Sequence, residues 1–344
     1  MSRAQLTSTV EQNTGGAVSP YVAGKNILIN GGMDIWQRGT SSTGIGTAKT
    51  FLADRWYANS ANAATTFGYT QSSSVTTGFQ YAAKIQRTAS NTGTNAIYFQ
   101  QDIETSNSIP FAGQTVTISL YAKAGANFSS ASNALSVNLV SGTGTDQSQY
   151  FAFLTGQATV ASGTATLTTS YQRFTFTGTV SSSATQLGIS INYTPVGTAG
   201  ADDSFFVTGV QVERGSVATP FSRAGGTLSG ELAACQRYYF RSNSANNSNS
   251  FLAPLGNAIS STAWTCAYTL PVTMRTAPNA LDYSGMVYYD GNTPVTISTL
   301  TLNQTNQNTP YLYGTAASGL TAFRGYYLFA NSSTSAYLGF SAEL

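Results

Sequence analysis

Two carboxylates in the first half of the chain stand at a spacing that acid–base chemistry can use. Asp102 and Glu104 are separated by one residue at the end of a stretch, residues 96–103, whose composition predicts a β-strand. Side chains at i and i+2 of a strand share a face, and their backbones lie roughly 6–7 Å apart, which suits a two-carboxylate hydrolase. Charges that protect an edge strand from aggregation are the more common explanation. Both readings stay open.

Aromatic rings beside polar side chains form a second group of candidates. A ring can stack on a sugar face while Asn, Gln, Asp or Arg side chains bond the hydroxyl groups. The candidates are Trp36, Arg38, Asp54, Arg55, Trp56 and Tyr57, with Tyr69, Tyr98 and Tyr193 as further rings. Most aromatic residues of a β-sandwich belong to its core, so a structural ion pair beside a core tryptophan is the alternative for residues 54–56.

Several classes of site are disfavoured by composition. The chain has no histidine, the commonest general base, and its two cysteines, Cys235 and Cys266, are too few for a zinc site. The formal net charge of +2 gives no electrostatic footprint for nucleic acid. No apolar run approaches the ~20 residues that span a membrane, and the N-terminus has no signal-peptide features. We therefore expect neither export by a signal peptide nor membrane insertion.

The elements that position these residues are predicted to be strands. Charged residues make up 8% of the 344 residues and aromatic residues 12%, a balance that suits polar-surfaced sheets around an aromatic core. Apolar and polar residues alternate in residues 114–122 (QTVTISLYA) and 171–177 (YQRFTFT), and no helical periodicity occurs within residues 25–223. This pattern predicts a jelly roll or β-sandwich. Residues 26–30 read as a further short strand.

The junction with the rest of the chain follows a strand predicted over residues 205–213. Its alternation slips at Gly209, where a β-bulge restores the register. Residues 231–239 are the most helix-like segment of the chain, with Ser229 as the expected N-cap. The segments that follow read as strands, and residues 326–340 read as a hairpin.

The sequence thus predicts an all-β protein of two sandwich domains with one short helix at their junction. The predicted parts are an extended N-terminal arm over residues 1–24, a jelly roll over 25–223, a hinge over 224–230, and a smaller β-sandwich domain over 231–344. The arm is either a disordered tail or a segment that becomes ordered against another subunit.

Several sequence blocks resemble those of bacteriophage fibre proteins. They are residues 26–39 (NILINGGMDIWQRG), 53–57 (ADRWY), 205–221 (FFVTGVQVERGSVATPF), 231–239 (ELAACQRYY), 274–278 (MRTAP) and 340–344 (FSAEL). Such blocks occur in tail-fibre and head-fibre subunits, in which a jelly roll similar to a carbohydrate-binding module precedes a small β-domain. The resemblance covers most of residues 26–344 and leaves residues 1–25 outside it.

The resemblance implies a non-enzymatic structural protein of the virion, made in the host cytoplasm. It implies a homotrimer that docks to other virion proteins through residues 1–24 and presents its sandwiches for receptor binding, with a host cell-surface glycan as partner. Two alternatives stay open: a head decoration or connector protein without receptor binding, and a capsule polysaccharide depolymerase that uses Asp102 and Glu104. No cofactor is expected, apart from a structural calcium ion.

The calcium expectation also follows from the resemblance. Jelly-roll carbohydrate-binding modules often hold calcium near their first and last strands, and here Asp202 and Asp203 precede the last predicted strand while Glu213 ends it. Their oxygens are of the hard type that calcium prefers. The alternative is that these are carboxylates in solvent, because calcium needs at least six oxygens and the spacing fixes none of them.

Overall fold

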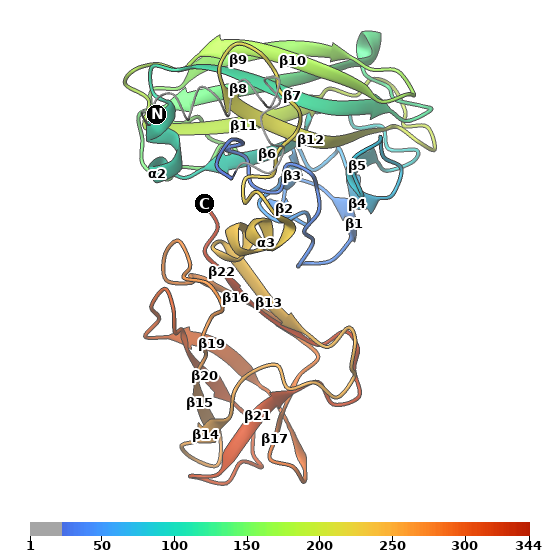
Figure 1. Ribbon diagram of the computed structural model, residues 1–344. Coiled ribbons are helices and arrows are strands. Elements are labelled where there is room, and N and C mark those ends of the chain that lie inside the picture. The colour runs from blue at the N-terminus through green and yellow to red at the C-terminus, as the bar shows by residue number, and fades with distance from the viewer. Residues whose placement is uncertain (1–22) are drawn as a thin grey trace, which may run out of the picture. The chain divides into compact units, whose positions relative to one another are not determined.

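A computed structural model describes residues 23–344 of the protein (Figure 1). The chain divides into two compact units, the first ending at Leu232 and the second covering Ala233–Leu344. This boundary lies inside helix α3 (Leu228–Gln236). Elsewhere in the described residues the helical segments are single turns, namely α2 (Thr105–Ser108), η1 (Ile109–Phe111) and η2 (Ala131–Asn133). The protein is all-β, as its alternation predicts.

The first unit is a sandwich of two antiparallel sheets of six strands each (Figure 1). Sheet 1 has the order β1 (Ser41–Ile45), β4 (Phe67–Ser72), β5 (Ala82–Arg87), β12 (Ser204–Arg214), β7 (Thr115–Ala124) and β10 (Gln172–Thr179). Sheet 2 has the order β2 (Thr50–Phe51), β3 (Tyr57–Ser60), β6 (Ile97–Ile103), β11 (Gln186–Tyr193), β8 (Ala134–Gly142) and β9 (Ala158–Thr166). Strands that follow one another in sequence often lie in opposite sheets, which is the connectivity of a jelly roll.

Alternation of side chains builds the core between these two sheets. Ile189 and Ile191 of β11 and Phe99 of β6 point inward from sheet 2, and all are fully buried. Ile118 and Leu120 of β7 face them from sheet 1. Burying each such side chain contributes about 1.5–3 kcal/mol. The intervening residues of β6 and β11 are therefore left on the outer face of sheet 2.

The β-bulge predicted at Gly209 is confirmed. The register between β12 and β7 shifts between Thr208 and Gln211. Gly209 has a φ of 60°, in the left-handed region that favours glycine. A Cβ at this position would also lie 2.4 Å from Cζ of Phe79, so both the backbone and the packing require glycine here.

The prediction of a strand over residues 26–30 is wrong, because this segment is held by side chains. Asn26 donates from Nδ2 to the carbonyl oxygen of Val210 at 3.0 Å. Its Oδ1 accepts the N–H of Val212 at 3.0 Å. One asparagine side chain thus bonds to β12 as a neighbouring strand would, and the backbone of residues 26–30 stays irregular.

Helix α3 begins earlier than predicted. Its first residue is Leu228, so Ser229 lies inside the helix and is not its N-cap. Thr227 takes that role, because its Oγ1 accepts the N–H of Gly230 at 3.1 Å. The acidic residue of the first turn, Glu231, is fully buried.

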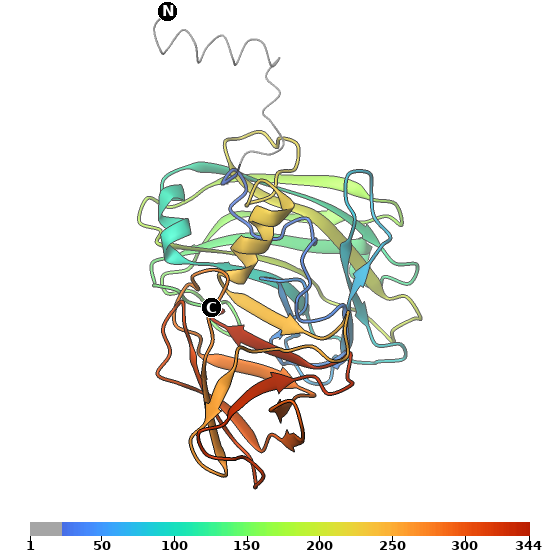
Figure 2. The same ribbon diagram turned by 60° about the horizontal axis from the view of Figure 1, so that its bottom comes forward.

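The second unit, coloured orange to red in Figures 1 and 2, contains two antiparallel sheets. The three-stranded sheet has the order β13 (Tyr239–Asn243), β22 (Tyr337–Ser341) and β16 (Ala280–Ser284). The seven-stranded sheet has the order β18 (Pro294–Thr296), β17 (Val287–Tyr289), β21 (Gly325–Phe329), β14 (Gly256–Ala258), β15 (Ala263–Ala267), β20 (Tyr311–Thr315) and β19 (Thr299–Asn303). The predicted hairpin is wrong, since β21 and β22 belong to different sheets.

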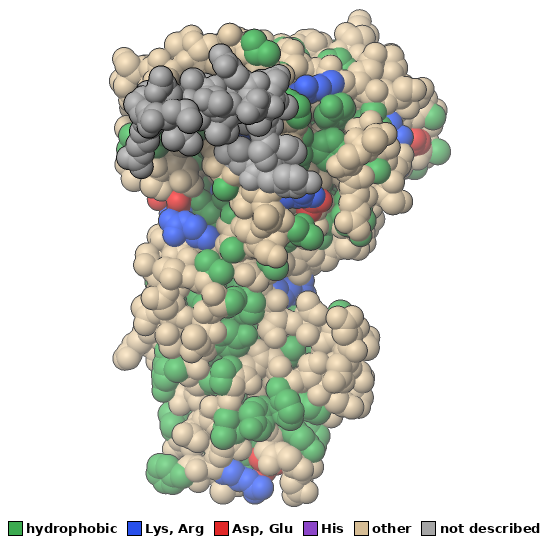
Figure 3. All heavy atoms as spheres, viewed as in Figure 1, with side chains coloured by type: hydrophobic (Ala, Val, Ile, Leu, Met, Phe, Trp, Pro, Cys, Tyr) green, Lys and Arg blue, Asp and Glu red, His purple; other side chains and the backbone are tan. Residues whose placement is uncertain are grey.

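The surface reflects the low charge content of the sequence. In Figure 3, acidic and basic side chains appear as isolated spots on a mostly uncharged face. Among the described residues, no helix is long and apolar enough to cross a membrane.

Candidate functional site

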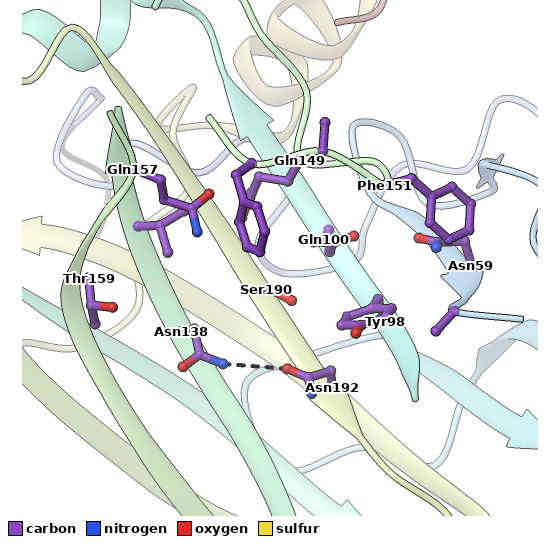
Figure 4. A pocket seen from close by; sticks show the side chains of 14 residues that line it. Asn59, Tyr98, Gln100, Asn138, Gln149, Phe151, Gln157, Thr159, Ser190 and Asn192 are labelled. Carbon is purple, nitrogen blue, oxygen red and sulfur yellow. Dashed lines mark hydrogen bonds between the residues drawn. The ribbon is translucent and has the colours of Figure 1, made fainter. Parts of the chain in front are cut away.

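A hollow of about 420 Å³ opens on the outer face of sheet 2, and we refer to it as the groove (Figure 4). Its floor is formed by strands of sheet 2, and its wall by residues 143–157, the segment between β8 and β9. The lining residues are Asn59, Ala61, Tyr98, Gln100, Asn138, Val140, Gln149, Phe151, Ala152, Phe153, Gln157, Thr159, Ser190 and Asn192. A hollow of this volume is within the range of small-molecule sites.

Strand register brings the polar floor residues together. Tyr98 of β6 pairs with Asn192 of β11, and Gln100 pairs with Ser190. On the other side of β11, Ser190 pairs with Asn138 of β8. Nδ2 of Asn138 donates to Oδ1 of Asn192 at 3.4 Å, the dashed line in Figure 4. The outward-facing residues of β6, β11 and β8 therefore form one continuous surface of amide and hydroxyl groups.

The wall supplies exposed aromatic rings. Phe151 is 56% exposed and Phe153 is 84% exposed, although both are large apolar side chains. Phe151 also has a φ of 52°, in the left-handed region that bulky residues rarely adopt. Strained backbone and solvated phenyl rings both cost free energy, and such costs are typical of functional segments.

The lining defines a distinct chemistry. Six of its side chains are amides, three are aromatic and none is charged. Amides both donate and accept hydrogen bonds, which matches hydroxyl groups that do the same. Phenyl and phenol rings offer apolar faces to C–H groups. The groove therefore suits a neutral ligand with many hydroxyl groups and an apolar face.

Two of the six predicted binding residues are core residues. Trp56 is 0% exposed and stacks on Phe99 with ring centroids 4.8 Å apart. Its Nε1 donates to the carbonyl oxygens of Ile29 and Asn30. Tyr57 is 1% exposed, and burial raises the pKa of its hydroxyl. A ring without an exposed face cannot stack on a sugar, so the prediction is wrong for these two residues.

The other four lie outside the groove lining. Asp54 is buried and accepts the N–H of Gln37. Arg55 is buried and donates to the carbonyl oxygen of Asp102 at 2.6 Å. The guanidinium of Arg38 lies 4.8 Å from the ring centre of Phe51, and the half-buried Trp36 contacts Tyr69 edge-on at 5.6 Å. Each of these contacts lies within the protein, and a binding role for these four residues stays a prediction. Of the further rings, Tyr98 lines the groove, whereas Tyr69 and Tyr193 are buried.

Asp102 and Glu104 do not share one strand, as the sequence predicts they should. β6 ends at Ile103, so Glu104 lies beyond the strand at the start of α2. There its Oε1 accepts hydrogen bonds from Ser106 and Asn107. Asp102 is buried beneath the wall of the groove. Neither carboxylate lines the hollow, so the groove itself contains no carboxylate pair of the kind that two-carboxylate hydrolases use.

The three predicted calcium ligands lie at opposite ends of one strand. Asp202 and Asp203 precede β12, while Glu213 is close to its end, so roughly 30 Å of extended chain separates them. They cannot ligate one ion. Asp202 pairs with Lys84 at 2.8 Å and Asp203 with Arg87 at 2.7 Å. Within residues 23–344, no group of three or more acidic or cysteine side chains is placed to hold a metal ion. Calcium also takes backbone and amide oxygens as ligands, so a structural calcium ion stays a prediction.

Sequence reasoning missed most of the lining. Tyr98 is among the candidate rings named from the sequence, whereas Phe151 and Phe153 are not. The available signal was the pair of phenylalanines in a short segment that also carries Gln147, Gln149 and Gln157. Pattern alone does not show that this segment covers the outer face of sheet 2.

The sequence matches no protein-family model and no curated protein. Among solved structures, a carbohydrate-binding module of family CBM4 is 20% identical, with a TM-score of 0.33, over 54% of this chain and 98% of that one. The enzymatically active domain of bacteriophage CBA120 tailspike protein 4 is 14% identical, with a TM-score of 0.33, over 57% of this chain and 22% of that one. TmCBM61, solved with β-1,4-galactotriose, is 12% identical, with a TM-score of 0.32, over 55% of this chain and 99% of that one. Similarity at this level decides nothing about function.

Proposed function

We propose that the first unit binds an uncharged oligosaccharide segment in the groove, and that the chain serves as a virion fibre subunit that adheres to a host surface glycan. The observation that carries the glycan proposal is the lining of amides and exposed aromatic rings without a charged side chain. The fibre proposal rests on the sequence blocks that resemble phage fibre proteins.

Each part of the lining has a role in this function. The amides of Asn138 and Asn192 exchange hydrogen bonds with sugar hydroxyls, and the rings of Tyr98 and Phe153 cover C–H faces. A carboxylated or sulfated sugar would lose hydration of its charge in the groove and find no cation in the lining to replace it. The groove therefore favours neutral sugars.

The affinity of a fibre for a glycan surface increases with the number of grooves that the fibre carries. A shallow polar site binds weakly, because the ligand gives up well-hydrated hydroxyl groups. Three copies held in one fibre raise the effective concentration of the second and third sites without any new contact. We propose a homotrimer in the virion for this reason. The predicted arm, residues 1–24, would attach it to other virion proteins and lies almost wholly outside the described residues.

The test is a titration of purified protein with neutral and acidic oligosaccharides of host surface polysaccharides. Tyr98→Ala and Phe153→Ala should each weaken binding of a neutral ligand about five- to thirtyfold, since each removes roughly 1–2 kcal/mol of ring contact. Phe323→Ala is the matched control for Phe153→Ala, because Phe323 is similarly exposed, at 90%, but belongs to the second unit. Unchanged affinity in both groove variants, or binding of acidic ligands alone, would refute the assignment. No binding at all would favour a decoration protein.

A further inference from the structure

The wall of the groove is held from below by a buried carboxylate. Asp102 lies in β6 and is 3% exposed. Its Oδ1 accepts the backbone N–H of Gln149 at 3.0 Å and Nε2 of the same residue at 3.2 Å. Its Oδ2 accepts the hydroxyl of Ser148 at 2.6 Å. One carboxylate thus bonds three donors from two consecutive residues of the wall.

A lysine on the same side completes the anchor. Nζ of Lys49 lies 3.6 Å from Oδ2 of Asp102 and donates to Oγ of Ser148 at 2.7 Å. It also lies 4.2 Å from the ring centre of Tyr57 and 5.9 Å from that of Tyr150. The negative charge of Asp102 is therefore balanced beneath the wall, and Tyr150 of the wall packs around the same cation.

A glycine makes room for this arrangement. Gly188 of β11 pairs directly with Asp102 across the two strands. A Cβ on Gly188 would lie 2.0 Å from Nε2 of Gln149 and 2.6 Å from its Cδ. The amide of Gln149 therefore rests on the bare backbone of Gly188 while it donates to Asp102. The backbone of Gly188 is not in the left-handed region, so alanine is allowed there except for this clash.

We infer that Asp102 is the positioning residue of the groove: by anchoring Ser148 and Gln149 it fixes the wall that presents Phe151 and Phe153 over the floor. Its role in ligand affinity rests on the proposed function, whereas its role in ordering the wall does not. Asp102 bonds the wall and does not line the groove, so it would act on a ligand only through the wall.

Hydrogen exchange of residues 143–157 tests the anchor without any ligand. Asp102→Asn replaces one carboxylate oxygen by an amide nitrogen, which cannot accept the hydrogen bonds of the wall or face Lys49 favourably. The backbone amides of residues 143–157 should therefore exchange roughly tenfold faster, or more. Gly188→Ala should raise this exchange in the same direction but by less, because its Cβ displaces only the side-chain amide of Gln149 and leaves the bonds of Asp102 to the Gln149 N–H and to Ser148. Glu213→Gln is the control: it replaces a buried carboxylate of sheet 1 that bonds Gln211 and Thr219, and should leave exchange of the wall unchanged.

Affinity for a neutral oligosaccharide then separates positioning from general stability. Asp102→Asn should weaken binding roughly tenfold and Gly188→Ala by less. The double variant should bind no more weakly than Asp102→Asn alone, because the bond that Gly188→Ala disturbs is one of those that Asp102→Asn already removes. Additive losses would contradict that shared route. Unchanged wall exchange in both single variants would overturn the inference. If the wild-type protein binds no glycan, the proposed function fails, and the exchange rates alone decide whether Asp102 positions the wall.

Discussion

Replacing Asp203 with asparagine should reveal how much the first unit depends on one buried ion pair. Nε of Arg87 lies 2.7 Å from Oδ2 of Asp203, and both side chains are 0% exposed. Asp203 also accepts the N–H of Ser129 at 2.9 Å and its hydroxyl at 2.8 Å. The variant keeps the size of the side chain and removes its charge, so Arg87 stays buried without a counter-ion.

The expected loss is large. Breaking a buried pair by removing one partner costs about 3–5 kcal/mol. The guanidinium of Arg87 also donates to the carbonyl oxygens of Gly93 and Gly197, which solvate part of its charge, so we expect the lower end, about 3 kcal/mol. That is a substantial share of the 5–15 kcal/mol that typically stabilises a domain.

The neighbouring residue provides the control. Asp202 pairs with Lys84 at 2.8 Å, but the two side chains are 35% and 22% exposed. Asp202→Asn should therefore cost only about 0.2–1 kcal/mol. Urea unfolding, with exchange of β12 reporting the first unit, measures both variants. Losses within 0.5 kcal/mol of each other, on the order of the accuracy of such comparisons, would refute the reasoning from burial.

Two further predictions concern titration of buried groups. Burial raises the pKa of Glu231 above its usual 4.5, so its contribution to stability is fully present below that pH and is lost as pH rises through the raised value. The Tm of Glu231→Gln minus the Tm of the wild type should therefore increase from pH 4 to pH 7. A difference that stays constant over this range would contradict the prediction. Burial raises the pKa of the Cys266 thiol to about 11. Iodoacetamide at pH 8 should therefore modify Cys266 only after unfolding, and mass spectrometry that found it modified in the native protein would show otherwise.

The alternation of apolar and polar residues predicted the structure correctly where the geometry of a single strand decides it. The bulge at Gly209 was predictable because a strand has a period of two, and a one-residue slip must be absorbed where the residue can adopt a positive φ. The strands with clear alternation, such as β7, were predictable for the same reason.

The sequence pattern failed to predict the backbone of residues 26–30, where side-chain hydrogen bonds replace the hydrogen bonds of a β-strand. Residues 26–30 have the composition of a strand, yet Asn30 lies at φ 58°. Its Oδ1 accepts the N–H groups of Asp34 and Ile35, and its Nδ2 donates to the carbonyl oxygens of Ile35 and Asp54. Three of these bonds are local, but the bond to Asp54 and the bonds of Asn26 to β12 join segments that only the folded chain brings together, so no local rule predicts them.

The sequence by itself determined the all-β class, the position of the bulge and the low share of charged residues. Only the tertiary structure decided which aromatic residues are exposed. Trp56 and Phe153 are both large apolar residues, but one lies between the sheets and the other in the segment that covers sheet 2. Exposure depends on what packs over a residue, and that is set by contacts between segments far apart in the chain. The groove exists for the same reason: Asp102 of β6 and Gly188 of β11 meet only in the sheet, and together they hold a wall from a third segment.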